Sequence, residues 1–287
     1  MHILITGATG RLGRDLARVL SRHDVTPLSH ADLDVAVAPA VDAAFERQSP
    51  EAVLHCAAMT DTGRCEREPD SAYAANATGS QNVARACART GARLIVISTN
   101  EVFDGDAATP YIEDSPLSAI NAYGRTKAEG ERLALQAYPA TSIVRTSWLY
   151  GAGAGNFIEK VRAIARERRP LRMVTDEISA PTSTVALAKA IGELLDAGAP
   201  SGIYHLANEG EASRYDWARE ILRLDGLDVP VEAVTTPQLR AEGYAGPLKP
   251  PYSVLANNNA RALGITMRPW QETLADHFAA AKVAADG

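Results

Sequence analysis

The chain has 287 residues, a length that allows one large domain or two modest ones. Its 29 basic and 35 acidic residues give a net charge of −6, which excludes a strongly basic nucleic-acid-binding protein as the default interpretation. Balanced charge together with 46% hydrophobic residues also excludes the intrinsically disordered class, so the composition indicates a globular protein.

The first half of the chain alternates short apolar runs with longer amphipathic segments. The apolar runs predict strands at 2–6, 25–28, 52–58, 94–99 and 142–145. The segments between them predict helices over 11–22, 41–48, 70–90 and 122–138. Pro27 weakens the second strand, since a central strand needs every backbone N–H group. Apolar strands separated by helices indicate an α/β fold with a doubly wound, Rossmann-type parallel sheet.

The second half is less regular and predicts a smaller C-terminal lobe. A glycine-rich loop at 151–155 precedes predicted helices over 156–168, 184–197 and 214–224 and a short strand at 203–206. Residues 237–251 are rich in proline and glycine and are predicted to be mostly loop. We therefore divide the chain into a sheet domain over 1–150 and a lobe over 151–287 that closes over a cleft. Segments such as 178–200 are expected to pack back on the sheet domain.

A glycine-rich segment, GATGRLG, follows the first strand and opens the first helix. It contains Gly7, Gly10 and Gly13. Glycines allow a tight turn and a close backbone approach, and the N–H groups at a helix N-terminus can hydrogen-bond a pyrophosphate. A glycine-rich turn without a ligand is the less favoured interpretation. The segment therefore predicts that the sheet domain binds a dinucleotide.

Tyr123 and Lys127 form a second pattern, because residues four apart lie on one face of a helix. A nearby ammonium favours the phenolate and is expected to lower the pKa of Tyr123, so that Tyr123 can exchange a proton with a carbonyl or hydroxyl oxygen. Ser98 and Thr99 end a predicted strand, where a doubly wound sheet places its active site. Thr99 could hydrogen-bond a substrate oxygen there, but a threonine that simply ends a strand stays an open alternative.

These motifs, with Ala57, Ala58 and Asn76 between them, resemble those of the extended short-chain dehydrogenases/reductases. Four further stretches resemble the family of dTDP-4-dehydrorhamnose reductases, namely VRTSWLYG at 144–151, SAPT at 179–182, GIYHL at 202–206 and KPPYSVL at 249–255. The resemblance runs nearly from end to end. It implies a reductase that uses NADPH or NADH to reduce C4 of a nucleotide-linked 4-keto-6-deoxy sugar, with the lobe binding the substrate.

The resemblance also assigns roles to single residues. Tyr123 would protonate the C4 oxygen, Lys127 would hold the nicotinamide ribose, and Thr99 would orient the keto oxygen. The residues implied to bind the cofactor are Gly7, Gly10, Arg11, Leu12, Gly13, Ser29, Asp34, Ala57, Ala58, Thr60, Asn76, Tyr123 and Lys127. Those implied to bind the substrate are Thr99, Asn100, Glu101, Trp148 and Lys249, and no metal site is implied. A core aromatic for Trp148 and a solvated loop charge for Lys249 stay open alternatives.

The chain departs from the family pattern near the predicted substrate site. TNEVF stands at 99–103 where Thr-Asp-Tyr-Val-Phe is usual, and Gly63-Arg64 stands where an Asp-Lys pair is usual. Lys249 stands where an arginine is usual, and lysine cannot grip a phosphate with two parallel hydrogen bonds. These differences leave the identity of the sugar more open than that of the cofactor.

Two other functions stay open. TNE at 99–101 resembles the Thr-Asp-Glu of nucleotide-sugar 4,6-dehydratases, and an epimerase belongs with this alternative. Asn100, however, cannot be the acid that water elimination needs. The fold is also used by a non-catalytic, NADP-binding regulatory subunit of methionine adenosyltransferase, although the intact Thr99, Tyr123 and Lys127 favour catalysis.

NADPH is favoured over NADH, because no carboxylate directly follows the second strand to bind a ribose 2′-OH. Ser29 and Arg11 could accept a 2′-phosphate, while Asp34 resembles a position that contacts adenine. Three cysteines without zinc-like spacing, and no apolar run of about 18 residues, argue against a disulfide-stapled or membrane-spanning protein. With no targeting segment recognised, we expect a cytoplasmic enzyme of a nucleotide sugar, without nucleic-acid or membrane partners and with a homodimer as a candidate assembly.

Overall fold

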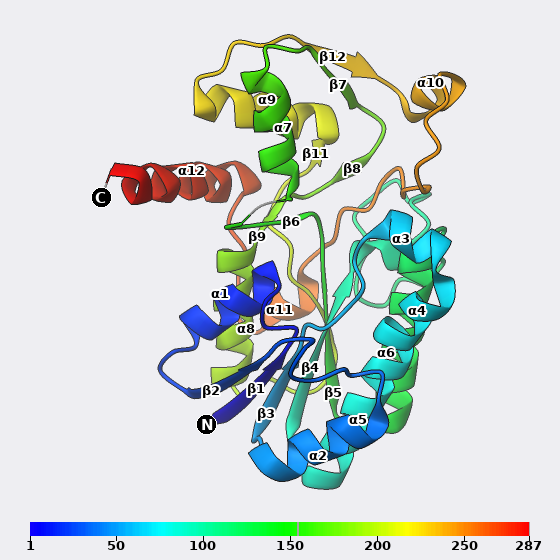
Figure 1. The fold of residues 1–287 in the computed structure, drawn as a ribbon, viewed down its shortest axis with the longest axis vertical. Helices are drawn as coiled ribbons and strands as arrows, with labels where there is room; N and C mark the ends of the chain where they lie inside the picture. Colours follow the sequence, from blue (N-terminus) through cyan, green and yellow to red (C-terminus); the bar gives the residue numbers. More distant parts are fainter. Residues whose placement is uncertain (154, 287) are drawn as a thin grey trace.

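A six-stranded parallel sheet forms the centre of the larger part of the molecule (Figure 1). The structure is a computed structural model that describes residues 1–153 and 155–286, with side chains described as far as residue 282. The strands are β1 (His2–Thr6), β2 (Asp24–Leu28), β3 (Ala52–His55), β4 (Arg93–Thr99), β5 (Thr141–Thr146) and β10 (Ile203–His205). Their order across the sheet is β10-β5-β4-β3-β1-β2, and each pair of neighbours is parallel. The predicted α/β fold is confirmed.

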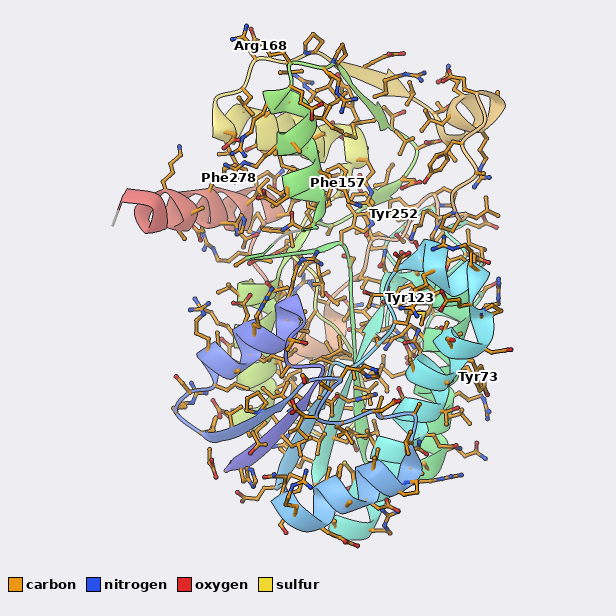
Figure 2. The ribbon with its side chains drawn as sticks, viewed as in Figure 1. Tyr73, Tyr123, Phe157, Arg168, Tyr252 and Phe278 are labelled. Atoms are coloured by element: carbon orange, nitrogen blue, oxygen red, sulfur yellow. The ribbon has the colours of Figure 1, made fainter. Side chains whose placement is uncertain are left out.

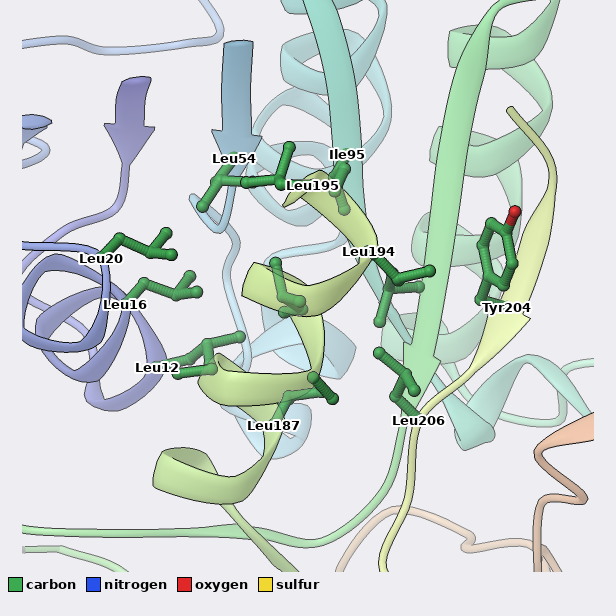
Figure 3. Close-up of a cluster of buried hydrophobic side chains, with 14 of the residues drawn as sticks. Leu12, Leu16, Leu20, Leu54, Ile95, Leu187, Leu194, Leu195, Tyr204 and Leu206 are labelled. Atoms are coloured by element: carbon green, nitrogen blue, oxygen red, sulfur yellow. The ribbon is translucent and has the colours of Figure 1, made fainter. Parts of the chain in front are cut away.

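Helices cover both faces of the sheet. One face carries α2 (Ala38–Gln48), α5 (Gly79–Thr90) and α6 (Ala122–Ala137), and the other carries α1 (Arg11–Val19), α8 (Thr184–Asp196) and α11 (Asn258–Ala262). In β1, Ile3 and Ile5 join the cluster that α1 and α8 complete, whereas Leu4 joins the cluster of α2 and α5. Figure 3 shows the first of these clusters. Because strand side chains alternate between two buried faces, the strands are apolar at successive positions.

The strand at 25–28 is confirmed and begins one residue earlier, at Asp24. It lies at the edge of the sheet, and within the described part of the chain it pairs with β1 alone. An edge strand uses one side of its backbone for pairing, so the missing N–H of Pro27 is tolerated there. The strand predicted over 52–58 is shorter than expected, because β3 ends at His55 and the chain then turns into the loop beside Gly7.

The helix predicted over 70–90 is interrupted. It consists of α4 (Pro69–Tyr73), a π-helical turn η1 (Ala74–Thr78) and α5. A π-helical turn holds an extra residue, and such turns are frequent at functional sites. Here η1 contains Asn76, whose side chain is fully buried.

The lobe is built from three pairs of short strands and the helices around them. The pairs are β6 (Leu149–Tyr150) with β9 (Thr182–Ser183), β7 (Leu171–Val174) with β12 (Val231–Val234), and β8 (Ile178–Ser179) with β11 (Ala212–Ser213). Its helices are α7 (Phe157–Arg166), α9 (Arg214–Asp225), α10 (Thr236–Ala241) and α12 (Trp270–Asp286). Helices α7, α9 and α12 surround a core that includes Tyr150 and Trp217, whereas α10 has no buried residue. The predicted loop over 151–155 includes Ala154, which lies outside the described residues.

The prediction of mostly loop over 237–251 is wrong for its first five residues, which belong to α10. Thr235 and Gln238 form a capping box, and Pro237 lies in the first turn, where a missing N–H is harmless. Two short elements beside the sheet were not predicted, α3 (Thr62–Arg67) and the 3₁₀ turn η2 (Asn100–Val102). Within the described residues, no helix combines the length and the apolar character that crossing a membrane requires.

The sheet contains strands from both sides of residue 150, where the sequence analysis divides the chain into a sheet domain and a lobe. Strand β10 pairs with β5, and α8 packs along α1, so residues 184–205 complete the sheet and one of its covering layers. The chain therefore passes from the sheet to the lobe and back again before it ends.

Candidate active site

A cleft of about 930 Å³ opens beyond the carboxyl ends of β1, β3, β4 and β5. Figure 2 shows Tyr123 beside the sheet and Phe157 in the lobe, and both line the cleft. The predicted residues that line it are Gly7, Gly10, Arg11, Leu12, Gly13, Asp34, Ala57, Ala58, Thr60, Thr99, Asn100, Glu101, Tyr123, Lys127 and Trp148. Ser29, Asn76 and Lys249 are not among its lining residues in the described chain. The cleft lies where a doubly wound sheet places its ligands.

The glycine-rich turn at one end of the cleft has no room for side chains. Gly7 has a φ of +65°, and a Cβ there would lie 2.7 Å from the backbone of Ala57. A Cβ on Gly13 would lie 2.6 Å from the carbonyl oxygen of Gly7. Gly10 caps α1 without a side-chain hydrogen bond, so the first N–H groups of the helix face the cleft without a capping side chain. This close-packed turn fits the diphosphate of a dinucleotide.

Substituting Gly13 with alanine tests this turn. The new methyl group would press on the backbone of Gly7 and Ala8, so, if the turn holds a dinucleotide, the affinity for NADPH should fall by about 1–3 kcal/mol. Gly202→Ala is the matched control, because the nearest atom to its Cβ would be 4.0 Å away, in Tyr204. Isothermal titration calorimetry measures both variants. Unchanged affinity in Gly13→Ala would show that the turn does not contact the cofactor.

Asn76 fixes the wall of the cleft from behind. Its Oδ1 accepts a hydrogen bond from the Met59 N–H at 2.8 Å, and its Nδ2 donates to the Met59 carbonyl at 3.0 Å. Nδ2 also donates to Oγ1 of Thr126, at 3.0 Å. Thr126 precedes Lys127 on α6, so Asn76 joins the loop after β3 to the helix that carries Tyr123 and Lys127. Its contribution to cofactor binding would be made through Met59.

Thr99, Tyr123 and Lys127 come together on the sheet side of the cleft. Thr99 ends β4, and Asn121 caps the helix of the other two by accepting a hydrogen bond from the Gly124 N–H at 2.8 Å. Burial raises the pKa of Tyr123, and the nearby Thr99 hydroxyl opposes part of that rise. The Lys127 ammonium donates to the Ile97 carbonyl at 2.7 Å.

Burial is the main influence on the pKa values of Tyr123 and Lys127. It raises the pKa of Tyr123 well above its usual value, and the nearby carboxylate of Glu101 adds to this effect. The expected lowering of the Tyr123 pKa by Lys127 is therefore wrong for this structure, since desolvation prevails. Burial lowers the pKa of Lys127 to about 8, and the carboxylate of Glu131 opposes that shift.

A buried ion pair lies directly below Lys127. Glu131 follows it by one helical turn and accepts hydrogen bonds from Arg145 at 2.7 and 3.1 Å. The two side chains are only 3% and 2% exposed, and the Ser98 hydroxyl also donates to Glu131. The pair thus joins α6 to β4 and β5 beneath Thr99, Tyr123 and Lys127. Sequence reasoning missed it, although an arginine that directly follows the apolar pair Ile143 and Val144 in a predicted buried strand was a usable signal.

The Asn100 side chain holds neighbouring segments together and, as an amide, cannot act as an acid. Its side chain is buried, and Nδ2 donates to the Ser253 hydroxyl at 2.7 Å and to the Ser179 hydroxyl at 3.2 Å. Its Oδ1 accepts a hydrogen bond from Oγ1 of Thr99 at 3.2 Å. Asn100 thus fastens the end of β4 to two segments from the second half of the chain.

Glu101 is held by two partners at the wall of the cleft. Its carboxylate accepts hydrogen bonds from Lys249 at 2.8 and 3.0 Å and from Asn121 at 2.7 Å. Lys249 is therefore bonded to Glu101 and is not one of the described lining residues. With an amide at Asn100 and an ion-paired carboxylate at Glu101, these two positions do not supply the acid and base of a dehydratase.

An aromatic wall forms the lobe side of the cleft. Trp148 stacks on Trp217 with ring centroids 5.7 Å apart, and Phe157 stacks on Trp217 at 4.4 Å. The guanidinium of Arg214 lies over the ring of Trp148, 3.6 Å from its centroid. Trp148 also has a φ of +41°, a strained conformation typical of functional sites. Trp148 thus packs on the lobe core and lines the cleft, while Phe157, Arg214 and Trp217 are lining residues that the sequence did not indicate.

Near the other end of the cleft, Ser29 is hydrogen-bonded to Asp32. The Ser29 hydroxyl and N–H donate to the Asp32 carboxylate at 2.6 and 2.9 Å, and these bonds lower the pKa of Asp32. The neighbouring His30 lines the cleft instead, together with Asp34. Arg11 lines the cleft too, and burial and the nearby Arg14 lower its pKa.

The chain is similar to known proteins over almost its whole length. The family model described as the RmlD substrate binding domain matches residues 1–283. A dTDP-4-dehydrorhamnose reductase of Streptomyces griseus is 39% identical over 285 residues, which span 96% of this chain and 93% of the relative.

Solved structures show the same similarity. A dTDP-4-dehydrorhamnose reductase of Clostridium acetobutylicum has a TM-score of 0.93 at 38% identity, covering 98% of this chain and 100% of the other. The dTDP-4-dehydrorhamnose reductase of Bacillus anthracis in complex with NADP has a TM-score of 0.91 at 34% identity, covering 96% and 98% of the two chains.

Proposed function

The chain belongs to the RmlD substrate binding domain family, and we propose that it is an NADPH-dependent reductase of a dTDP-linked 4-keto-6-deoxy sugar. The observation that carries the proposal is that a glycine-rich turn and the set of Thr99, Tyr123 and Lys127 line one cleft. Relatives that are reductases of such sugars, and one structure in complex with NADP, support it.

The residues of the sheet domain fit a dinucleotide along the carboxyl ends of the strands. The turn at Gly7, Gly10 and Gly13 would take the diphosphate, and Ala57, Ala58 and Thr60 would line the nicotinamide side, with Asn76 supporting them through Met59. When bound, NADPH supplies a hydride. Lys127, with a pKa of about 8, still carries its proton in most molecules at neutral pH and would donate to the ribose hydroxyls.

Tyr123 would give its proton to the C4 oxygen of the sugar. A raised pKa keeps the phenol protonated at neutral pH, which is the form that can act as an acid. The Thr99 hydroxyl, which lines the same cleft, would orient the keto oxygen. Trp148 would present a flat apolar surface to the sugar, and closure of the lobe would exclude water from the reacting atoms.

A direct assay tests the proposal. Adding a dTDP-4-keto-6-deoxyhexose to the protein and NADPH should remove the absorbance of the reduced nicotinamide, with one hydride consumed for each sugar reduced. Tight cofactor retention with conversion of the sugar but no net oxidation of NADPH would favour an epimerase or dehydratase instead. NADPH binding without any conversion would favour a regulatory subunit.

Substituting Arg11 with alanine tests the choice of cofactor. If Arg11 contacts the 2′-phosphate, its removal should weaken NADPH by about 1.5–3 kcal/mol, a usual value for hydrogen bonds to charged groups, and leave NADH nearly unchanged. Arg18→Ala is the matched control, because Arg18 lies on the same helix but is exposed and pairs with Asp15. Ratios of kcat/KM for the two cofactors measure the effect. An equal loss for both would place Arg11 at the shared diphosphate.

A further inference from the structure

Arg214 stands on the lobe wall of the cleft, at the start of α9. Its guanidinium lies 3.6 Å from the ring centroid of Trp148 and 5.3 Å from that of Phe157. Trp148 is held in turn by its stacking on Trp217. An aromatic face attracts a guanidinium without using its N–H donors. The aromatic wall therefore positions Arg214 and leaves its donors for other groups.

The N–H groups of Arg214 have little to bind within the protein. The facing carboxylate, Glu177, places Oε2 3.6 Å from Nε, which is a long ion pair. Among the described residues, no acceptor within ordinary hydrogen-bond length faces its two terminal nitrogens. Yet the Arg214 side chain is only 21% exposed. Among the described residues, no nitrogen of Arg214 is a fully buried atom that lacks a partner, so its unpaired donors are open to the cleft, where an entering anion can reach them.

Other cationic side chains near the substrate side of the cleft already have hydrogen-bond or ion-pair partners within the protein. Lys249 donates to both carboxylate oxygens of Glu101, at 2.8 and 3.0 Å. Lys127 donates to a backbone carbonyl next to the catalytic set. Arg64 lies at the wall formed by α3 and bonds Glu68 at 2.9 Å. Arg214 is therefore the cation on this side whose donors are best placed to meet an anion that enters the cleft.

We propose that Arg214 binds the diphosphate of the sugar nucleotide in the substrate site. This inference rests on the proposed function. A guanidinium presents two parallel N–H groups that match two phosphate oxygens, and such charge-assisted pairs are strong in a site with little water. The diphosphate would take the place of the distant Glu177 carboxylate. Lys249, bonded to Glu101, would not be the main phosphate ligand.

Calorimetric titration of nucleoside diphosphates into the NADPH-loaded protein tests this assignment. The probes are dTDP, UDP and GDP, and the variants are Arg214→Gln and Arg214→Lys. We expect Arg214→Gln to weaken dTDP by about 10- to 100-fold, and Arg214→Lys to restore part of the loss because it keeps the charge without the paired donors. In steady-state assays KM for the sugar nucleotide should rise more than kcat falls.

Arg219→Gln is the matched control. Arg219 lies on the same helix, is exposed, and has its guanidinium 5.6 Å from the ring centroid of Tyr215, away from the cleft. The Arg219→Gln variant should bind dTDP with the same affinity as the wild-type protein. NADPH affinity and thermal unfolding of each variant report whether the fold and the cofactor site are intact. If Arg214→Gln fails to fold, the test rests on Arg214→Lys, which keeps the positive charge and the aliphatic part of the side chain. Binding of dTDP by that variant as tightly as by the wild type would then overturn the role of Arg214.

The outcomes separate the two proposals. Wild-type binding of dTDP that survives unchanged in Arg214→Gln and Arg214→Lys would overturn the role of Arg214 and leave the proposed reductase standing. Binding of UDP or GDP but not dTDP, with loss of that binding in Arg214→Gln, would overturn the dTDP-linked substrate and support diphosphate recognition by Arg214. Failure of the wild type to bind any of the three would overturn both.

Discussion

Replacing Tyr123 with phenylalanine is expected to reduce kcat by about 10²–10⁴-fold, the usual contribution of a positioned general acid. The substitution removes only the hydroxyl, from a side chain that lines the cleft. The glycine-rich turn and Lys127 are unchanged in this variant, so NADPH affinity should fall by no more than one hydroxyl contact contributes, about 1 kcal/mol. Single-turnover oxidation of NADPH in the presence of the sugar nucleotide measures the chemical step directly.

Tyr73→Phe is the control for this prediction. Tyr73 is 44% exposed at the end of α4, and its hydroxyl makes a long hydrogen bond of 3.5 Å to Glu129. Its removal should leave kcat unchanged. Turnover by Tyr123→Phe at the rate of Tyr73→Phe would refute the role of Tyr123 as the proton donor.

Replacing Glu131 with glutamine is expected to produce the largest loss of stability, about 3–5 kcal/mol in the free energy of unfolding. The change keeps the shape of the side chain but leaves the Arg145 guanidinium without a counter-charge in a site where it is 2% exposed. The measurement is denaturant unfolding. The matched control is Glu129→Gln on the same helix, whose carboxylate pairs with Arg132 at 2.7 Å in a far more exposed pair. That pair should contribute about 1 kcal/mol or less. Equal effects of the two substitutions would contradict the prediction.

The same variant has a second expected result, in the pH dependence of kcat/KM. The Glu131 carboxylate raises the pKa of Lys127 against the effect of burial, which holds it at about 8. Without that carboxylate the pKa of Lys127 falls further. The ammonium is then lost at a lower pH, so the alkaline limb of the profile should move toward acid. A limb that stays in place or moves toward alkali would show that Lys127 does not control it.

The sheet and the cofactor side of the cleft could be predicted from the sequence, because their signals are local. Two buried faces make a parallel strand apolar at successive positions, as in Ile3, Leu4 and Ile5. The glycines at 7–13 are needed by the turn itself. Even the uncertain strand around Pro27 was found, although only the strand order shows that it lies at an edge.

The substrate side could not be predicted to the same degree, because distant segments build it. Arg214 and Trp148 are 66 residues apart, by their numbers, and only the packing of α9 against β6 and α7 places a guanidinium on an indole ring. The partner of Lys249 also comes from a distant segment of the chain. Its sequence position suggested a phosphate ligand, but a residue far along the chain, Glu101, binds its ammonium. The π-helical turn likewise carries Asn76, whose side chain bonds the Met59 backbone, a contact between separate segments that helix propensity does not reveal.

The return of the chain to the sheet after its first passage through the lobe bears on how the protein folds during synthesis. Leu12 and Leu16 of α1 share one buried cluster with Leu187 and Leu194 of α8 (Figure 3), and β5 has no neighbour on its outer edge until β10 arrives. A nascent chain that has released only its first 150 residues therefore presents an apolar helix face and an open strand edge to solvent, both of which favour aggregation. The sheet becomes complete only after residue 205 has emerged, so much of the lobe must leave the ribosome before the cofactor-binding half can reach its final form.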